Sequence, residues 1–340
     1  LVARSIAAEL AAAGVNWNLA PVADVNVPAN PVIGTRAFGD NADLVARHVA
    51  AYVRGLQSRR VAACAKHFPG HGSTTQDSHL ELPTLVGDVE AGLAPFRAAI
   101  DAGVVSIMTA HVRVHELPAT VDPALLGDLL RGQLGFDGVV FADALEMKAV
   151  SETIGVVETA VHALAAGVDA LCIGHDLGAD AVDAIVEALA ARVPEDRLRD
   201  AARRVRSLAL WARPDVGSPD RAEAAAAARR ALEIAGDVTV GETPRVVELR
   251  PSANIAAGEA EYGLAQAVVV REGEPVPAAE VYVVRDAHRH AWMRAAVDRP
   301  DAIVVEIGLP VWRPTRSRGY VATHGGGGAS LHAAEEVLGL

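Results

Sequence analysis

The sequence predicts an α/β protein in which a (β/α)8 barrel is followed by a three-layer α/β sandwich. Three observations lead to this fold class. Strand-like and helix-like segments alternate five times between residues 15 and 211, as a parallel sheet with helical crossovers requires. Polar residues follow the apolar run of each predicted strand. A stretch containing Pro and Gly near residue 214 then separates these segments from a second set of short β-branched runs.

The alternation is read from apolar runs and from signals that start or end helices. Gly14 follows the first predicted helix and Asp122 precedes a later one, the positions where Gly and Asp are favoured. We expect helices at 2–13, 42–57, 89–102, 122–133, 156–166, 179–191 and 195–211. We expect strands at 15–20, 61–65, 104–108, 138–142 and 169–173.

Titratable residues follow all five predicted strands: Asp24, Lys66 with His67, His111, Asp143, and His175 with Asp176. In a (β/α)8 barrel the carboxyl ends of the strands form the rim that carries the active site. A doubly wound sheet gathers its chemistry at one switch point instead, so this distribution favours the barrel. Three of the eight strands remain unassigned. We expect them upstream of Leu1 in the natural chain; otherwise the barrel interpretation is wrong.

The chain divides into a barrel domain at residues 1–213, a linker at 214–220 and a second domain at 221–340. The second domain opens with an Ala- and Arg-rich helix predicted at 221–235. It continues with β-branched runs at 245–250, 281–285, 302–307 and 320–323, and with a helix at 288–297. This pattern predicts the three-layer sandwich.

Composition excludes several kinds of partner. The net charge of −12 argues against nucleic-acid and anionic membrane surfaces, which reward clustered Lys and Arg. No apolar run reaches the length of a membrane span. Cys64 and Cys172 lie in short apolar runs and are expected to be buried free thiols. No signal peptide is visible, and we expect a cytoplasmic protein whose oligomeric state the sequence leaves open.

The most informative segment covers residues 66–83 and reads KHFPGHGSTTQDSHLELP. Pro69 and its neighbouring glycine exclude a continuing helix or a central strand, so we expect a loop beyond a strand end. The spacing of Asp77 and His79 lets the carboxylate accept a hydrogen bond from the imidazole and fix its tautomer. A histidine held in this way can donate a proton and later take one back. The alternative is an ordinary solvated turn.

Two further alternatives stay open at this point. Asp143 ends an apolar strand and is either a helix N-cap or a catalytic carboxylate. His67, His71, Asp77 and His79 are acceptable zinc ligands. No HExxH helix is present, however, and Pro69 breaks the register between the first two histidines. We therefore predict no metal and no cofactor.

The motifs resemble those of a known family. KHFPGHG followed by DSH and LP, with FADALEM downstream of SIMTAH, resembles bacterial β-N-acetylglucosaminidases of glycoside hydrolase family 3. NWNLAPVADVN and NPVIGTRAFG are similar as well, so the resemblance covers residues 5–176. Members of that family begin with three further barrel strands, the number missing above. Their early segment also supplies a sugar-binding carboxylate and arginine that this chain does not contain, and Ser73 stands where relatives often have Asp.

Carried over residue by residue, the resemblance implies that Asp143 is the nucleophile and His79 the general acid/base, with Asp77 as its partner. It implies that Arg36, Lys66 and His67 hold sugar hydroxyls. The expected activity is a retaining exo-β-N-acetylglucosaminidase that removes terminal GlcNAc from peptidoglycan or chitin-derived fragments. One alternative is a phosphorylase that uses the same site with phosphate as acceptor, because an imidazole repels phosphate less than a carboxylate does. Another is a non-catalytic sugar-binding protein built on a truncated barrel.

Overall fold

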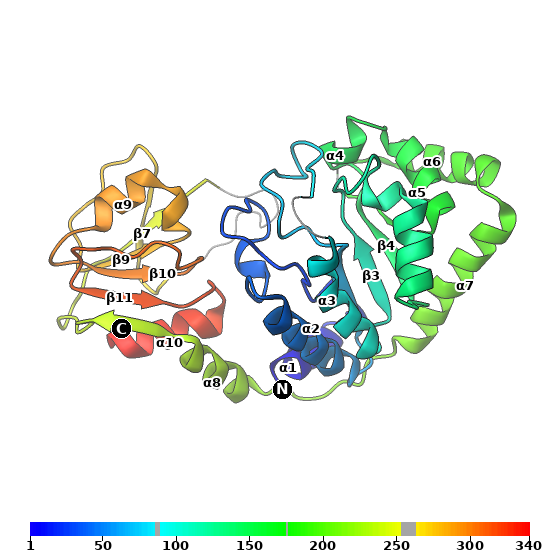
Figure 1. The fold of residues 1–340 in the computed structure, drawn as a ribbon. Coiled ribbons are helices and arrows are strands. Elements are labelled where there is room, and N and C mark those ends of the chain that lie inside the picture. Colours follow the sequence, from blue (N-terminus) through cyan, green and yellow to red (C-terminus); the bar gives the residue numbers. More distant parts are fainter. Residues whose placement is uncertain (86–88, 175, 253–262) are drawn as a thin grey trace. The chain divides into compact units, whose positions relative to one another are not determined.

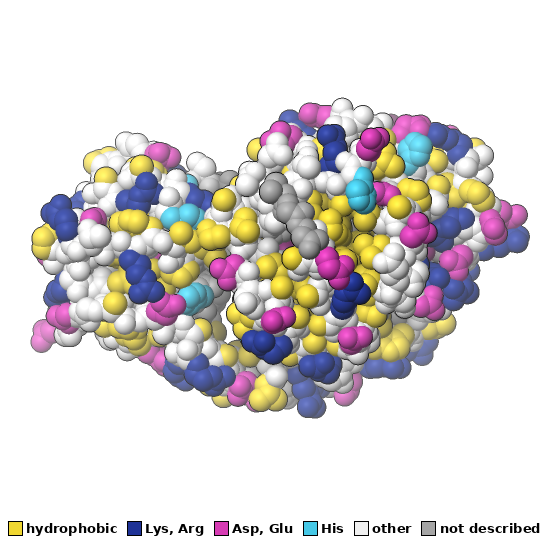
Figure 2. Space-filling model, viewed as in Figure 1, with side chains coloured by type: hydrophobic (Ala, Val, Ile, Leu, Met, Phe, Trp, Pro, Cys, Tyr) yellow, Lys and Arg dark blue, Asp and Glu magenta, His cyan; other side chains and the backbone are white. Residues whose placement is uncertain are grey.

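The computed structural model describes residues 1–85, 89–174, 176–252 and 263–340. The chain forms two compact units, Leu1–Pro219 and Asp220–Leu340 (Figure 1). Within the described residues, no helix is both long enough and apolar enough to cross a bilayer. On the face drawn in Figure 2, acidic and basic side chains are interspersed.

The first unit is built on five parallel strands whose order in the sheet follows their order in the chain. They are β1 (Trp17–Asn18), β2 (Ala62–Phe68), β3 (Ser106–Thr109), β4 (Val139–Ala144) and β5 (Ala170–Cys172). The α-helices are α1 (Val2–Ala12), α2 (Ala42–Gln57), α3 (Val89–Asp101), α4 (Lys148–Ser151), α5 (Val156–Ala166), α6 (Ala179–Arg192) and α7 (Glu195–Trp211). Strands joined in this way form a half-barrel, and the predicted alternation is confirmed.

Shorter helical segments complete the first unit. They are η1 (Gly34–Arg36), η2 (Ala119–Val121) and the π-helix η3 (Ala124–Gln133). Asp122 starts η3 as predicted, because its Oδ1 accepts hydrogen bonds from the backbone N–H groups of Ala124 and Leu125. The predicted helix is present, with π rather than α geometry.

Two strands of the first unit run further than the sequence predicts. The strand expected at 61–65 continues as β2 to Phe68, and the strand expected at 138–142 continues as β4 to Ala144. Backbone pairing explains the first extension, because Lys66 forms a parallel bridge with Val22 beyond the end of β1. Lys66, His67 and Asp143 lie toward the carboxyl ends of their strands as predicted, but inside the strands rather than beyond them. All three belong to strands, whose pairing holds their backbones in place.

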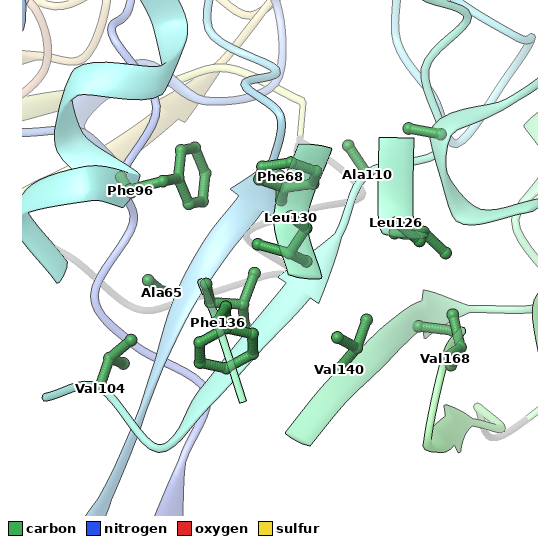
Figure 3. Packing of buried hydrophobic residues seen from close by; sticks show 14 of the residues in the cluster. Ala65, Phe68, Phe96, Val104, Ala110, Leu126, Leu130, Phe136, Val140 and Val168 are labelled. Atoms are coloured by element: carbon green, nitrogen blue, oxygen red, sulfur yellow. The ribbon is translucent and has the colours of Figure 1, made fainter. Parts of the chain in front are cut away.

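The core of the first unit lies between the sheet and its covering helices (Figure 3). Phe68 from β2 meets Phe96 from α3 edge to face, with ring centroids 5.3 Å apart, an arrangement that aromatic pairs favour. Leu126 and Leu130 of η3 and Val140 of β4 extend the same core. This packing supports the carboxyl ends of β2 and β4.

The second unit contains six strands in the order β6-β11-β10-β9-β7-β8. They are β6 (Glu233–Gly236), β7 (Val246–Arg250), β8 (Val268–Arg271), β9 (Val281–Val284), β10 (Ile303–Glu306) and β11 (Gly319–Ala322). Its helices are α8 (Arg221–Ala231), η4 (Ala287–Arg289), α9 (Ala291–Val297) and α10 (Gly328–Leu338). Residues of α9 and α10 enter two separate apolar clusters of this sheet.

The second unit differs from the sequence prediction at two places. The helix expected at 221–235 ends at Ala231, and the next residues form β6, which pairs antiparallel with β11. Local helix propensity favours the longer helix, and tertiary pairing overrides it. Strand β8 was not predicted at all. It lies at the edge of the sheet and is half-exposed. Its pattern of buried and exposed residues is therefore a weak signal for a strand.

Candidate active site

Asp143 lies near the carboxyl end of β4, with its side chain 21% exposed. Its Oδ1 accepts a hydrogen bond of 2.9 Å from the backbone N–H of Ala144. Burial acts to raise the pKa of Asp143, but the imidazoles of His67 and His111, that N–H group and Lys66 together lower it below the usual value. The carboxylate is therefore ionised at neutral pH, as a nucleophile must be.

His67 lies beside this carboxylate. Its Nε2 is 4.0 Å from Oδ2 of Asp143, and its Nδ1 is 2.8 Å from Oδ2 of Asp24. The shorter contact is a hydrogen bond, whereas 4.0 Å is too long for one. The Val22–Lys66 bridge aligns the chain so that Asp24 comes next to His67. Nε2 of His67 therefore makes no direct hydrogen bond to Asp143.

Asp24 is fully buried and connects the two histidines that flank Pro69. Its Oδ1 accepts hydrogen bonds from the backbone N–H groups of His67, at 3.2 Å, and His71, at 2.6 Å. Burial acts to raise the pKa of Asp24, but the charge and hydrogen bond of His67 and the backbone N–H of His71 lower it overall. An ionised Asp24 fixes the beginning of the loop as well as the ring of His67.

The Asp77–His79 pair lies on the loop that follows β2. Oδ1 of Asp77 is 2.8 Å from Nδ1 of His79 and also accepts the backbone N–H of His79 at 2.9 Å. The side chains are 15% and 22% exposed. Burial acts to raise the pKa of Asp77, but these bonds to His79 lower it overall. The predicted contact between the two side chains is confirmed, and it uses Nδ1 of His79 rather than Nε2.

Arg36, at the end of η1, brings these groups into one electrostatic neighbourhood. Burial lowers the pKa of its guanidinium, and the carboxylates of Asp24, Asp143 and Asp77 oppose that shift. Its Nη2 donates to the carbonyl of Val32 at 3.0 Å. Its buried Nε has no hydrogen-bond partner in the described part of the chain. A buried donor without a partner is uncommon in a folded protein.

His111 supports the backbone next to Asp143. Its Nε2 lies 3.0 Å from the carbonyl oxygen of Ala144, and its Nδ1 lies 2.8 Å from Oγ1 of Thr120. A carbonyl only accepts hydrogen bonds, so Nε2 carries a hydrogen. Burial lowers the pKa of His111, which favours the neutral ring. His111 thus holds Ala144 by its carbonyl, while the N–H of Ala144 holds Asp143.

Residues 1–208 match the family model described as the glycosyl hydrolase family 3 N terminal domain. The chain belongs to glycosyl hydrolase family 3. A beta-hexosaminidase from Stenotrophomonas maltophilia (strain K279a) is 42% identical over 178 residues, which cover 50% of this chain and 52% of the relative. One from Chromobacterium violaceum (strain ATCC 12472) is 36% identical over 253 residues, covering 72% and 69%. The chain spans about half the length of the first of these relatives.

A solved structure resembles this family 3 chain over both units. It is a glycoside hydrolase family 3 beta-N-acetylglucosaminidase from Paenibacillus sp. str. FPU-7, with a TM-score of 0.84 and 29% identity. The similarity covers 99% of this chain and 76% of that one. The resemblance to this family that the sequence motifs indicate is therefore confirmed.

In this family 3 fold, the residues expected to form the site come from separate segments that converge. Asp143 comes from β4, Lys66 and His67 from β2, Arg36 from η1, and the Asp77–His79 pair from the loop. The N-cap interpretation of Asp143 is wrong, because its carboxylate binds the next residue inside a strand.

The sequence places Asp24 and His111 at strand ends but predicts no role for either. Their position at the rim is the only sequence signal for a role, because their contacts to His67 and to Ala144 depend on strand pairing. His175 lies outside the described residues, and Asp176 is exposed.

The alternative zinc set does not assemble in this family 3 site. His71 is 2.8 Å from Oγ1 of Thr74 through Nδ1 and 2.8 Å from Oγ of Ser78 through Nε2, so both ring nitrogens bind hydroxyl groups. Nδ1 of His79 lies 2.8 Å from Oδ1 of Asp77. Across the residues that the structure describes, no three His, Cys, Asp or Glu side chains are grouped to hold a metal.

Proposed function

We propose that this chain carries the catalytic site of a retaining exo-β-N-acetylglucosaminidase. Its substrates would be fragments of peptidoglycan or chitin that end in GlcNAc. The observation that carries the proposal is an ionised Asp143 at the end of β4, set beside His67 and accompanied by a loop that bears the Asp77–His79 pair. Family membership and the beta-hexosaminidase names of relatives support the substrate class.

The proposed reaction is a double displacement. The carboxylate of Asp143 attacks the anomeric carbon, while His79, protonated at Nε2, gives that proton to the leaving oxygen. A covalent glycosyl-aspartate forms, and the aglycone leaves as an alcohol. His79 then takes a proton from water, whose oxygen attacks the anomeric carbon and frees Asp143. Asp77 holds Nδ1–H of His79 and stabilises the imidazolium.

Sugar binding falls to the cations and donors around Asp143. Nε of Arg36 is a donor without a described partner, which suits a bound hydroxyl or carbonyl group. His67 faces the 4.0 Å gap to Asp143, where a sugar hydroxyl can accept from or donate to Nε2. Lys66 adds a cation on the same strand. Aromatic residues make up only 4% of the chain, which fits polar contacts to one terminal sugar better than a stacking platform.

Turnover of an aryl β-GlcNAc glycoside by the full-length protein tests this function. Asp143→Ala should lower kcat by at least about 10³-fold, and Asp183→Asn, an exposed change on α6, should leave it unchanged. With a slow fluorinated substrate, mass spectrometry should find the sugar attached to the peptide that contains Asp143. Parental turnover by Asp143→Ala would end the proposal. Sugar binding without turnover by the parent protein would favour the non-catalytic alternative.

The imidazole at the proposed acid/base position favours one second candidate, a phosphorylase. A carboxylate there would repel an incoming phosphate dianion, whereas a neutral or cationic histidine would not. Phosphate would then take the place of water and release GlcNAc 1-phosphate. Comparing products and rates with and without phosphate decides between the two. Free GlcNAc at an unchanged rate in phosphate excludes the phosphorylase.

For the fold, we propose that the five parallel strands belong to a (β/α)8 barrel whose other three strands are not among the residues that the structure describes. We propose a three-layer sandwich for the second domain, with 1–213, 214–220 and 221–340 as barrel, linker and sandwich. The chain order of the sheet and the apolar clusters around α9 and α10 support these assignments.

A further inference from the structure

The loop that carries Asp77 and His79 is fastened through the residue between them. Ser78 is 1% exposed, although its two neighbours are partly exposed. Its Oγ lies 2.8 Å from Nε2 of His71, and its carbonyl accepts a 3.2 Å hydrogen bond from the backbone N–H of Ala149. Asp77 and His79 are the immediate chain neighbours of this anchored serine. The position of Ser78 therefore constrains the positions of both.

His71 is itself held firmly at its other end. Its backbone N–H donates to Oδ1 of Asp24 at 2.6 Å, and its Nδ1 lies 2.8 Å from Oγ1 of Thr74. Asn30 binds the carbonyl of His71 at 2.8 Å and that of Thr74 at 3.0 Å through Nδ2. All four residues are buried. The imidazole of His71 therefore connects a buried, hydrogen-bonded cluster to Ser78.

The hydroxyl and ring hydrogens around His71 determine which groups donate and which accept. Thr74 has one hydroxyl hydrogen, which its Oγ1 donates to the carbonyl of His71 at 3.0 Å. With that hydrogen on the carbonyl, Oγ1 accepts from Nδ1 and Nε2 accepts from Ser78; the opposite tautomer reverses both ring bonds and keeps both contacts. Burial lowers the pKa of His71 to about 4, and the ring is neutral under ordinary conditions. In either tautomer the neutral ring forms one hydrogen bond to Thr74 and one to Ser78.

We propose that His71 is a positioning residue that holds the Asp77–His79 pair in place for proton transfer through its hydrogen bond to Ser78. His71 is not assigned any contact with the reacting atoms. Only the expected effect on turnover rests on the proposed function. The hydrogen bond that holds the loop, between His71 and Ser78, is a property of the free protein. Losing the bond should displace His79 while Asp143, His67 and Asp24 keep their places.

Two substitutions of His71 separate the contact to Ser78 from the contact to Thr74. Glutamine places a polar atom near the position of Nε2, so His71→Gln can still reach Ser78. Asparagine places its polar atoms near the position of Nδ1, so His71→Asn can reach only Thr74. Ser78→Ala removes the hydroxyl directly. Thr75→Ala, an exposed change in the same loop, serves as the control.

The kinetic test compares substrates with good and poor leaving groups. A poor leaving group needs the proton from His79, whereas a good one departs without it. Ser78→Ala and His71→Asn should each lower kcat on a poor leaving group about ten- to a hundredfold, with a much smaller effect on an activated aryl glycoside. The double variant should be no slower than either single variant. His71→Gln should recover most of the loss, and Thr75→Ala should show none.

Hydrogen–deuterium exchange tests the fastening without reference to activity. Backbone amides at 76–82 should exchange faster in Ser78→Ala and His71→Asn than in the parent, His71→Gln or Thr75→Ala. If exchange and leaving-group dependence both match the parent in Ser78→Ala, the positioning role is wrong. If the parent cleaves no glycoside yet the exchange pattern holds, the proposed function fails and the fastening stands.

Discussion

Asp24 and His67 form a buried pair in which Oδ2 of the carboxylate lies 2.8 Å from Nδ1 of the ring. This contact decides which nitrogen of His67 carries a hydrogen. An ionised carboxylate only accepts, so Nδ1 is protonated, and Nε2 is the atom that faces Asp143. The side of His67 turned toward the proposed nucleophile is therefore controlled by a residue from the neighbouring strand's loop.

Replacing Asp24 with Asn should invert the tautomer of His67. The Asn side chain can keep an oxygen on the backbone N–H groups of His67 and His71, but its amide then donates toward Nδ1. The ring hydrogen moves to Nε2, and we expect kcat/KM to fall about 10²- to 10⁴-fold, as when a catalytic histidine is held in the wrong tautomer. Nitrogen NMR shifts of His67 report the tautomer directly. Parental kcat/KM in Asp24→Asn, beside an unaffected Asp183→Asn, would contradict this prediction.

The contact between Asp24 and His67 also marks the limit of prediction from sequence. Asp77 and His79 are two residues apart, and their hydrogen bond followed from spacing alone. Asp24 and His67 are 43 residues apart, and their meeting depends on the parallel alignment of Val22 with Lys66. Strand alignment is a long-range property that neither local propensity nor periodicity encodes. The role of His111 at the backbone of Ala144 was hidden for the same reason.

Secondary structure was predictable where local signals and tertiary contacts agree. The helix at 42–57 appears as α2 with the predicted bounds, because Asn41 caps it and its apolar face is regular. The segment after Ala231 shows the opposite case, since the residues that follow an Ala-rich helix form strand β6 against β11. Pairing with β11 decides the structure there. The sequence does not reveal which distant strand β6 pairs with.

The neutral His71 makes stability depend on pH in the acidic range. The pKa of His71 is about 4 in the folded chain, against 6.5 for an ordinary histidine. The unfolded chain binds more protons between these values, so stability is full above pH 6.5 and is lost as pH falls toward 4. The loss amounts to about 3 kcal/mol at most. Urea unfolding of the parent and of His71→Gln at pH 7 and pH 4.5 measures it, and the variant should lose less. Equal losses in both proteins would contradict the assignment.

Glu306 in the second unit should give the opposite dependence. Its buried carboxyl accepts backbone N–H groups of Asp286, Ala287 and Gly308, but burial outweighs these bonds and raises its pKa from 4.5 to about 8. The folded chain binds more protons between these values. Stability should fall by about 1.4 kcal/mol for each pH unit as pH rises through that range.

Melting temperatures at pH 6 and pH 8.5 test the Glu306 prediction. The difference between the two values should shrink in Glu306→Gln, which cannot ionise. Glu242→Gln, at an exposed position of the same unit, should keep the parental difference. If Glu306→Gln kept it too, the titration of another group would be responsible.

Asp169 should be a major determinant of how α7 is held in the first unit. Its fully buried side chain pairs with Arg131 of η3 at 2.7 Å and with Arg197 of α7 at 2.6 Å. Removing the carboxylate takes the shared anion from both guanidinium groups, although Arg197 keeps a 3.4 Å pair with Asp200; breaking such a buried pair costs about 3–5 kcal/mol. Asp169→Ala should therefore lower the urea midpoint strongly, whereas Asp183→Ala should not. A midpoint within error of the parent would show that the pairs contribute nothing net.

Gly72 makes the close approach that brings the loop after β2 against the segment carrying Asp24. A Cβ added at Gly72 would lie 2.1 Å from the carbonyl oxygen of Val25, far inside contact distance, and backbone atoms there cannot rotate away as a side chain could. Val27 N–H also donates to the carbonyl of Gly72 at 3.0 Å. Gly72→Ala must push these two segments apart, and such overpacking costs about 1–3 kcal/mol.

The displacement caused by Gly72→Ala should also reach the proposed proton donor. Gly72 follows His71 directly, so moving it strains the path from Asp24 through His71 to Ser78. We expect a lower melting temperature together with a loss of kcat on glycosides with poor leaving groups. Gly127→Ala is the matched control, because an added Cβ in η3 meets nothing within 4 Å. If Gly72→Ala melted and turned over like Gly127→Ala, the two segments would have to be free to separate, and the loop could not be held by the contacts described for it.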